Sequence, residues 1–302
     1  NLVIARICQP GSKMATSAYL KAYFKEDLNH WRIYRYMDKL YNTQQETVQK
    51  ISVTHTMKVL GGQVGLMFYD VTSLYFETPA RDDLRQPGFS KDGKTSESQI
   101  ILGLLVSAGG YPLSYAVFNG SQYEGRTIIP IIDDFKQRFN LADFVVVADS
   151  GLMSKTNVKL LNDAGYRYII GARIRNESGA VRDWILSLDK VDGQLYERAY
   201  NKRERLIVGY SAKRAAKEAH NREQGVEGLR KRYATGSLTK DKLNKHGYNK
   251  FLEISKDVHV VINQDKVEQD ARWDGLKGYR TNTDLPVDTI LEQYHGLWVV
   301  ER

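Results

Sequence analysis

The sequence predicts an α/β protein in which helices flank a mixed sheet, with a helical region before the sheet and a basic insertion within it. Three observations predict this organisation. Apolar runs and helix-like apolar stripes alternate between residues 65 and 174 in the order β-β-β-helix-β-helix-β, the pattern of a sheet covered by helices. Residues 13–60 lack strand-like alternation, and residues 202–250 account for the net positive charge of the chain.

Composition sets the general class. The chain has 302 residues, 42% of them hydrophobic, which is enough to bury a substantial core. Its single cysteine, Cys8, excludes an intramolecular disulfide framework, and no His and Cys cluster has the spacing of a zinc site. The sequence has no apolar run of membrane-spanning length and no secretion signal. We therefore expect a cytoplasmic protein without a membrane partner.

Residues 1–62 are predicted to form a helical region. Large apolar residues recur there at spacings near three and four, which favours short amphipathic helices with aromatic side chains in the core. The residues of this pattern are Leu20, Tyr23, Phe24, Trp31, Tyr34, Met37, Leu40 and Tyr41. Gly61, Gly62 and Gly65 end the pattern.

Residues 63–175 are predicted to form the first part of the sheet domain. The runs LMFYDV and LYFE predict two adjacent strands, and QIILGLLVS and YPLSYAVF predict a hairpin. A helix is predicted over 124–139. The run DFVVVADS is typical of a buried central strand. A second helix, from about 153 to 164, then leads to the strand YRYIIGARI.

Residues 176–270 are predicted to be a basic insertion. Between 202 and 250 there are fourteen lysines and arginines but five acids, a net charge of +9, while the whole chain carries +8. A polyanionic partner would explain this charge, and a helix that only faces water is the alternative. The run SAKRAAKEAHNREQGVEGLRKRY favours a helix weakened by Gly225 and Gly228. VHVVIN, at 258–263, belongs either to the insertion or to the main sheet.

Residues 271–302 are predicted to complete the sheet domain. The run DGLKGYRTN indicates a turn and a short strand, and Pro286 precedes a last helix over 287–302. Ile290, Leu291, Tyr294, Leu297 and Trp298 form its apolar stripe. Glu301 follows Ile290 by about three helical turns, so it is predicted to point toward the sheet.

Three acids are the candidate catalytic residues. Asp70 and Asp149 are each predicted to end an apolar strand, at the sheet edge where α/β proteins form their sites. A helix cap or turn is the alternative role for either aspartate, and a salt bridge is the alternative for Glu301. Carboxylates that converge repel one another unless a cation binds between them. We therefore predict Mg²⁺ or Mn²⁺ as the cofactor, with two ions serving phosphodiester chemistry.

At these residues the chain resembles the DDE transposases of bacterial insertion sequences, in the branch with a Y-x2-R-x3-E-x6-K signature and an insertion between the second Asp and the Glu. The likeness runs from ARICQPGSKMAT through GLMFYDVTSLYFE, GFSKDGKTSESQIILGLLVSAGGYPLSYAVFNG, VVVADSGLMS and YRYIIGARI to DGLKGYRTN and YHGLWVVER. It implies a ribonuclease H-like fold in which Asp70, Asp149 and Glu301 are the catalytic, metal-binding acids.

The signature is incomplete in this chain. Tyr294 matches the signature Tyr, but Leu297 stands at the Arg position, and the chain ends at Arg302 before the Lys position. Because it begins with Asn1 and ends inside a predicted helix, we expect a fragment of a longer product that is weak or inactive as a nuclease by itself.

One motif competes with this interpretation. The residues from Gly88 to Thr95 fit the phosphate-loop pattern GxxxxGK[ST] letter for letter. That loop binds phosphate only between an entering strand and a leaving helix. Here a proline-containing stretch precedes the motif and a predicted strand follows it, so an ATPase that depends on Lys94 is the least favoured function.

The sequence therefore predicts a DNA transposase that cleaves strands at element ends and joins them to target DNA. Its partners would be double-stranded DNA, as terminal repeats and target, and a second copy of the chain, because two ends must be cut together. In the cell it would be cytoplasmic and associate with the bacterial nucleoid when bound. The alternative function is a non-catalytic DNA-binding remnant of an inactivated element. The predicted DNA-binding residues are Tyr294, Lys213, Arg214, Lys217, Arg230, Lys231 and Arg232.

Overall fold

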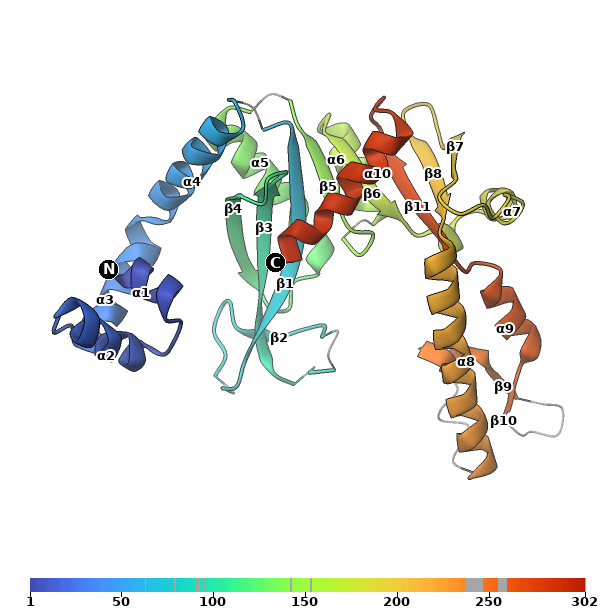
Figure 1. Ribbon diagram of the computed structural model, residues 1–302, viewed down its shortest axis with the longest axis horizontal. Helices are drawn as coiled ribbons and strands as arrows, with labels where there is room; N and C mark the ends of the chain where they lie inside the picture. The colour runs from blue at the N-terminus through green and yellow to red at the C-terminus, as the bar shows by residue number, and fades with distance from the viewer. Residues whose placement is uncertain are drawn as a thin grey trace. The chain divides into compact units, whose positions relative to one another are not determined.

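The computed structural model describes residues 1–301 apart from 63, 79, 91–92, 95, 142, 153, 237–246 and 255–259, and it leaves the side chains of Glu124, Val299 and Glu301 undescribed. The chain forms two compact units: residues 1–64 with 111–114, and residues 65–110 with 115–302 (Figure 1). We call them the N-terminal unit and the sheet unit. No helix in the described ranges is long and apolar enough to span a membrane.

The N-terminal unit is helical, as predicted. Its helices are α1 (Leu2–Cys8), α2 (Lys13–Phe24), α3 (His30–Thr43) and α4 (Gln45–Val59). Ser12 and Asn29 cap α2 and α3, because their side-chain oxygens accept hydrogen bonds from the amides of Ala15 and Trp31. The expected aromatic core is wrong. Leu20 is fully buried, whereas Tyr23 and Trp31 are 75% and 64% exposed, so these aromatic residues lie outside the core.

The sheet unit is built on a nine-stranded mixed sheet. The strands of this sheet are β1 (Leu66–Phe76), β2 (Gln86–Pro87), β3 (Ser98–Ser107), β4 (Pro112–Asn119, whose first three residues are counted with the N-terminal unit), β5 (Val145–Ala148), β6 (Arg167–Ala172), β7 (Leu195–Ala199), β8 (Arg205–Tyr210) and β11 (Leu276–Thr281). Along one half the order is β4-β3-β1-β5-β6, where β3 is antiparallel to β1 and the strands β1, β5 and β6 are parallel. This is the ribonuclease H-like arrangement, so the predicted fold class is confirmed.

The sequence-based strand pattern needs two corrections, and the structure decides one alternative that the pattern left open. LMFYDV and LYFE are one strand, because β1 pairs with β3 without a break from Met67↔Ser107 to Phe76↔Ser98. Strands β7 and β8, which come from the predicted insertion, extend the main sheet beside β11. The run at 258–263 contributes β10 (Val260–Ile262), which pairs with β9 (Leu252–Ile254) in a separate small sheet; residues 258 and 259 lie outside the described part.

Helices cover both faces of the main sheet. On one face lie α5 (Ile128–Phe139) and α6 (Lys155–Asp163), and Tyr69 on β1 donates a hydrogen bond to Thr127, the residue before α5. On the other face, α10 (Val287–His295) and the 3-10 segment η5 (Gly296–Glu301) run across the central strands (Figure 1). Ile290 and Tyr294 of α10 pack on strand residues that include Phe68, Val147 and Ile169, and together they form one core cluster. We call this side of the sheet the α10 face.

The predicted last helix over 287–302 is therefore only partly correct. The α-helix ends at His295, and the chain continues as the 3-10 segment η5. Gly296 lies close against β1: a Cβ atom there would stand 2.6 Å from Cζ of Phe68. Glycine also favours the helical conformation poorly. The close approach of this backbone to β1 places the change of helix type at Gly296.

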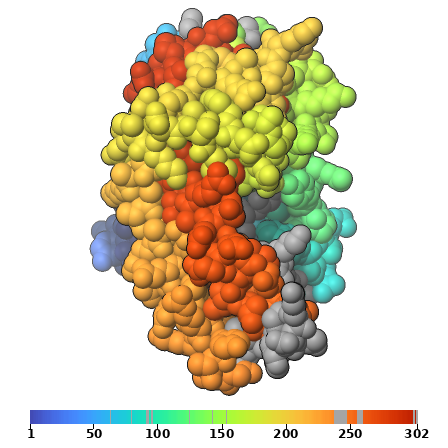
Figure 2. All heavy atoms as spheres, turned by 90° about the vertical axis from the view of Figure 1, so that its right-hand side faces the viewer, coloured from blue at the N-terminus to red at the C-terminus, as the bar shows by residue number. Residues whose placement is uncertain are grey.

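The basic segment contains one long helix, α8 (Ala212–Ala234), which continues through Gly225 and Gly228. Its buried side chains Val226 and Leu229 form a small core cluster with Phe251, Leu252 and Val260. The helix α9 (Gln264–Ala271) packs beside this cluster through Val267. Figure 2 shows α8 and α9 on one face of the sheet unit, together with α7 (Gly179–Leu186). The predicted domain boundaries at 175 and 270 stay predictions.

Candidate nucleic-acid interface and acidic site

Asp70 and Asp149 lie at the same level of two adjacent parallel strands. The pairing of β1 with β5 runs in register from Leu66↔Val145 to Tyr69↔Ala148, so Asp70 and Asp149 are the next two residues along these strands. Neighbouring strands are about 4.8 Å apart. Asp149 ends its strand as predicted, but Asp70 is the fifth residue of the eleven-residue β1, which continues along β3 after β5 has ended.

The two aspartate side chains belong to the α10 face. Successive side chains of a strand point to opposite faces, so a residue shares its face with the residue two positions earlier. Phe68 precedes Asp70 by two residues, and Val147 precedes Asp149 by two; both are in the core cluster beneath α10. Tyr294 of α10 confirms this for Asp149, because its hydroxyl donates a hydrogen bond of 3.0 Å to Oδ1.

Tyr294 is a buried support for Asp149. Only 5% of this residue is exposed, and its ring packs edge-on against Tyr279 with 4.8 Å between the ring centroids. Burial, followed by the charge and hydrogen bond of Asp149, raises the pKa of the Tyr294 hydroxyl well above its usual range. The phenol therefore stays protonated and donates to the carboxylate. Its predicted contact with DNA stays a prediction.

The turn after β5 also holds Asp149 in place. Asp149 is exposed, and the amide of Gly151 lies 3.5 Å from its Oδ2. The guanidinium of Arg173 donates to the carbonyl oxygens of Ser150 and Gly151, both at 3.1 Å. A carboxylate on a turn that is fixed by side-chain and backbone hydrogen bonds keeps its orientation while remaining accessible to a ligand.

The third predicted acid, Glu301, is the last residue of η5. Its side chain is not described. The segment that carries it packs against β1 and β3, and Leu297 and Val300 lie against the core cluster of the α10 face. Leu297, at the position where the resemblance expects arginine, is thus an apolar packing residue. The backbone brings the end of the chain to the strand that bears Asp70.

The acidic donor set suits a hard divalent cation. Carboxylate oxygens are the ligands that Mg²⁺ and Mn²⁺ prefer, and Asp70 and Asp149 place two of them on one face at one level. Among the described side chains, no group of three His, Cys, Asp or Glu residues could hold a metal ion. Because the Glu301 side chain is outside that description, the predicted third ligand is untested and stays a prediction.

A cationic cleft of about 610 Å³ adjoins Asp149. The charged residues of its lining, besides Asp149 and Glu218, are Arg173, Arg175, Arg214 and Lys277. Of these four cations, only Arg214 was predicted from the sequence to bind DNA. The run DGLKGYRTN gave a usable signal for Lys277: in a strand, Lys277 and Tyr279 share a face. Arg173 and Arg175 follow β6, and they come close to Asp149 because β6 pairs with β5. A local sequence pattern does not reveal which strands pair.

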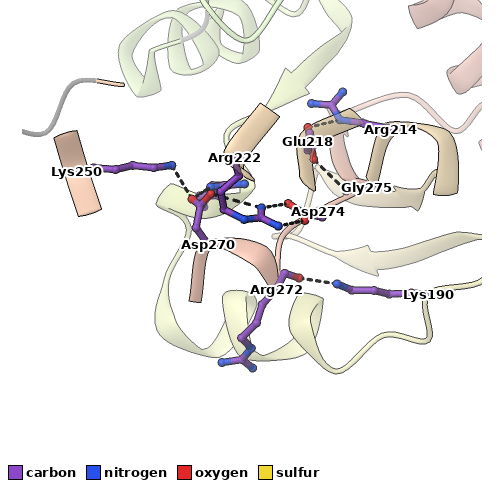
Figure 3. Close-up of polar contacts among 10 residues, drawn as sticks. Lys190, Arg214, Glu218, Arg222, Lys250, Asp270, Arg272, Asp274 and Gly275 are labelled. Carbon is purple, nitrogen blue, oxygen red and sulfur yellow. Dashed lines mark hydrogen bonds and ion pairs between the residues drawn. The ribbon is translucent and has the colours of Figure 1, made fainter. Parts of the chain in front are cut away.

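A partly buried ion pair and a hydrogen bond to a backbone amide attach α8 to the turn before β11 (Figure 3). Arg222 donates two hydrogen bonds of 2.6 Å to the carboxylate of Asp274. One turn earlier in α8, Glu218 accepts from the amide of Gly275 at 3.0 Å and from Nε of Arg214 at 2.8 Å. This attachment fixes Arg214 at the edge of the cleft.

The predicted DNA-binding residues of α8 are exposed. They are Lys213, Arg214, Lys217, Arg230, Lys231 and Arg232. At 3.6 residues per turn, Lys213, Lys217 and Lys231 share the side of α8 opposite to the buried Val226 and Leu229. Arg222, by contrast, is used in the attachment of α8, so part of the positive charge of this segment is structural. The contact of these residues with DNA stays a prediction.

The phosphate-loop motif lacks the structure that it needs. The two-residue strand β2 precedes it, and the strand β3 follows it instead of a helix. Lys94 lies 3.6 Å from a carboxylate oxygen of Glu97 and over the ring of Tyr75. Residues 91, 92 and 95 of the motif are outside the described part. The interpretation against a nucleotide loop is confirmed for the described elements.

Comparison with known protein families identifies the family to which this chain belongs. Residues 65–302 match the family model described as the transposase DDE domain. The chain therefore belongs to the DDE transposase family. No curated protein sequence matches it.

Similar solved structures are also transposases. One is the piggyBac transposase synaptic complex with hairpin DNA, at 9% identity and a TM-score of 0.43, with 86% of this chain and 46% of that chain covered. Two are Mos1 transposase paired-end complexes, one with the left transposon end (8% identity, TM-score 0.24) and one with Mn (10%, 0.23). Each covers 55% of this chain and 56% of the other. The chain thus spans about half the length of these proteins.

Proposed function

We propose that this protein is a DNA transposase that cleaves strands at the ends of its element and transfers them into target DNA, using Mg²⁺ or Mn²⁺. The observation that carries the proposal is the register of Asp70 with Asp149 on the α10 face of a chain that belongs to the DDE transposase family. Within the family we assign it to the bacterial insertion-sequence branch, on the motifs around Tyr294 and on the length of chain between Asp149 and Glu301.

In the proposed mechanism Asp70, Asp149 and Glu301 would hold two divalent ions. Such ions, when bound, favour attack on a phosphodiester by stabilising the charge on the attacking and leaving oxygens. The protein's own contribution is position. Tyr294 orients Asp149 through its hydroxyl, the Arg173 guanidinium fixes the turn that follows, and the close packing of Gly296 on Phe68 keeps η5 at β1.

The DNA would lie along the cationic side of the sheet unit. The exposed lysines of α8 and the cationic cleft beside Asp149 form charged surfaces of the kind that binds backbone phosphates. The piggyBac and Mos1 structures are named as synaptic and paired-end complexes. A transposase that joins two ends requires at least two copies, so we propose a homodimer on double-stranded DNA in the cytoplasm.

Strand cleavage tests the proposal. The wild-type protein is the full-length protein encoded by the element that contains this chain, and the substrate is duplex DNA that carries the ends of that element, incubated with Mg²⁺ or with EDTA. We expect Mg²⁺-dependent cleavage that is lost in Asp70→Asn and Asp149→Asn, while both variants still bind the duplex. Asp163→Asn, at an exposed position at the end of α6, is the matched control and should cleave normally.

Two outcomes would count against the proposal. If the wild-type protein binds the element ends without cleaving them, the chain is a non-catalytic DNA-binding remnant. If the asparagine variants cleave normally, the aspartates are structural turn or strand residues.

A further inference from the structure

Lys277 lies in the cationic cleft on the same face as Asp149. It is in β11, two residues before Tyr279, which belongs to the core cluster of the α10 face. Its ammonium nitrogen is 4.6 Å from the ring centroid of Tyr294 and 5.4 Å from that of Tyr279. The side chain therefore rests against two adjacent aromatic rings, at the wall of a cleft that Asp149 also lines.

The other cations of this cleft are already engaged. Arg173 donates to two backbone carbonyl oxygens, Arg175 is paired with Asp270, and Arg214 is paired with Glu218. Among the described residues, no carboxylate lies within ion-pair distance of Lys277. Partial burial lowers the pKa of its ammonium group and the charge of Arg214 lowers it further, and the charge of Asp149 offsets only part of this lowering. A partly desolvated cation is costly without an anionic partner, and cation–π contacts offset only about 1–2 kcal/mol.

Tyr294 connects Lys277 to the acidic site. Its hydroxyl donates to Asp149, and its ring face contacts the Lys277 ammonium. One rigid side chain thus sets the spacing between a carboxylate proposed to bind metal and a cation that forms no ion pair with any described carboxylate. A phosphodiester held at the metal site would place a neighbouring backbone phosphate within the same cleft.

We propose that Lys277 binds a phosphate of the DNA strand next to the cleavage site. This inference rests on the proposed function and names the residue that fixes the strand beside Asp149. A single ammonium suits a phosphodiester, which carries one negative charge and is contacted at successive positions along a strand. Lys277 would act as a point charge, and the rings of Tyr279 and Tyr294 would limit its movement.

The test is the salt dependence of binding to a short duplex of mixed sequence, with Ca²⁺ in place of Mg²⁺. Each phosphate contact contributes about 0.9 to the slope of log K against log salt concentration. We expect Lys277→Gln to reduce the slope by about 0.9, so that the loss of affinity between about 50 and 200 mM salt becomes about 3.5-fold smaller. Lys277→Arg keeps the charge and should retain the wild-type slope.

Two further variants separate this role from a structural one. Tyr294→Leu removes the ring face that contacts the Lys277 ammonium and should reduce the slope. Lys159→Gln, at an exposed position on α6 outside the cleft, is the charge control and should leave the slope unchanged. The thermal unfolding temperature of Lys277→Gln should equal or exceed that of the wild type, because the substitution removes a partly desolvated charge.

The inference and the proposed function fail in different ways. If the wild-type protein cleaves element ends with Mg²⁺ but Lys277→Gln keeps the full slope, Lys277 does not bind phosphate and the transposase proposal stands. If the wild type shows neither cleavage nor salt-dependent binding, the proposed function fails first. A reduced slope in Lys277→Gln that Lys277→Arg does not restore would also overturn the inference.

Discussion

Replacing Glu204 by glutamine should destabilise the outer half of the sheet. Glu204 is 2% exposed and joins three parts of the fold. Its carboxylate accepts hydrogen bonds from Nε of Arg280 on β11 at 2.8 Å and from Asn162 of α6 at 2.7 Å, and it also accepts from the hydroxyl of Tyr168 on β6. Strand β11 bears Lys277, so this network also supports the cationic cleft.

The expected loss follows from burial. Removing one member of a buried ion pair leaves the other charge without compensation and costs about 3–5 kcal/mol. Glutamine also brings an amide donor to a place where all the neighbours donate. Asp143→Asn is the matched control, because Asp143 pairs with Arg167 at 2.7 Å but its side chain is 81% exposed. An exposed pair contributes about 0–1 kcal/mol.

Urea unfolding at pH 7 measures both effects. Trp31→Phe should be the background, because Trp31 is the tryptophan of the N-terminal unit and the remaining tryptophans then report on the sheet unit. The loss in Glu204→Gln should exceed the loss in Asp143→Asn by at least about 2 kcal/mol. Equal losses would show that burial does not set the strength of the Glu204 pair.

The same pair predicts a pH dependence. Burial alone would raise the pKa of Glu204, but hydrogen bonds from Tyr168, Arg280 and Asn162 outweigh burial and lower the pKa below its usual value of 4.5. A carboxylate whose folded-state pKa is lowered stabilises the fold above its unfolded-state pKa, and this contribution is lost as the pH falls through the folded-state pKa. The stability difference between wild type and Glu204→Gln should therefore be full at pH 7 and should shrink below about pH 4.5.

Three further predictions concern the site and the basic helix. Tyr294→Phe should weaken Mn²⁺ binding about 10- to 100-fold while changing the free energy of unfolding by no more than about 1.5 kcal/mol; unchanged Mn²⁺ affinity in a calorimetric titration would contradict the supporting role. Arg222→Met should loosen the attachment of α8 and speed hydrogen exchange in its first half, and wild-type exchange there would show that the ion pair does not hold the helix. Replacing Lys213, Lys217 and Lys231 together by glutamine should reduce the salt slope of duplex binding by about 0.9 for each phosphate that these lysines bind, whereas an unchanged slope would mean that this side of α8 only faces water.

The part of the fold that the sequence predicted is the part with strong local patterns. The run VVVA before Asp149 is apolar throughout because β5 is buried on both faces, and the stripe of α5 follows from its buried residues Ile128, Ile131 and Phe135. These patterns lie within a few residues of one another. Strand β5, with Asp149 at its end, could therefore be located from the sequence alone.

Features that depend on long-range pairing could not be located in this way. Asp70 was expected at a strand end, yet β1 continues because β3, thirty residues later in the chain, pairs with it along its length. Strand β7 was missed because its polarity is mixed, and β8 was missed because its apolar run is only three residues long; both join the sheet through β11. Lys277 reaches the Asp149 cleft only because β6 and β11 pair across more than a hundred residues. The N-terminal aromatic residues were misplaced because periodicity predicts a helix face but does not show what covers it.

The central claim is that the carboxylates of Asp70 and Asp149 bind divalent metal ions at one common site. Iron-mediated cleavage of the protein backbone measures this directly: Fe²⁺ replaces Mg²⁺, ascorbate and peroxide generate hydroxyl radicals at the bound ion, and mass spectrometry locates the cuts. We predict cuts close to residue 70 and residue 149 together, suppressed by excess Mg²⁺ and lost in Asp149→Asn. Cuts at only one of these strands, or cuts that persist unchanged in Asp149→Asn, would contradict the claim.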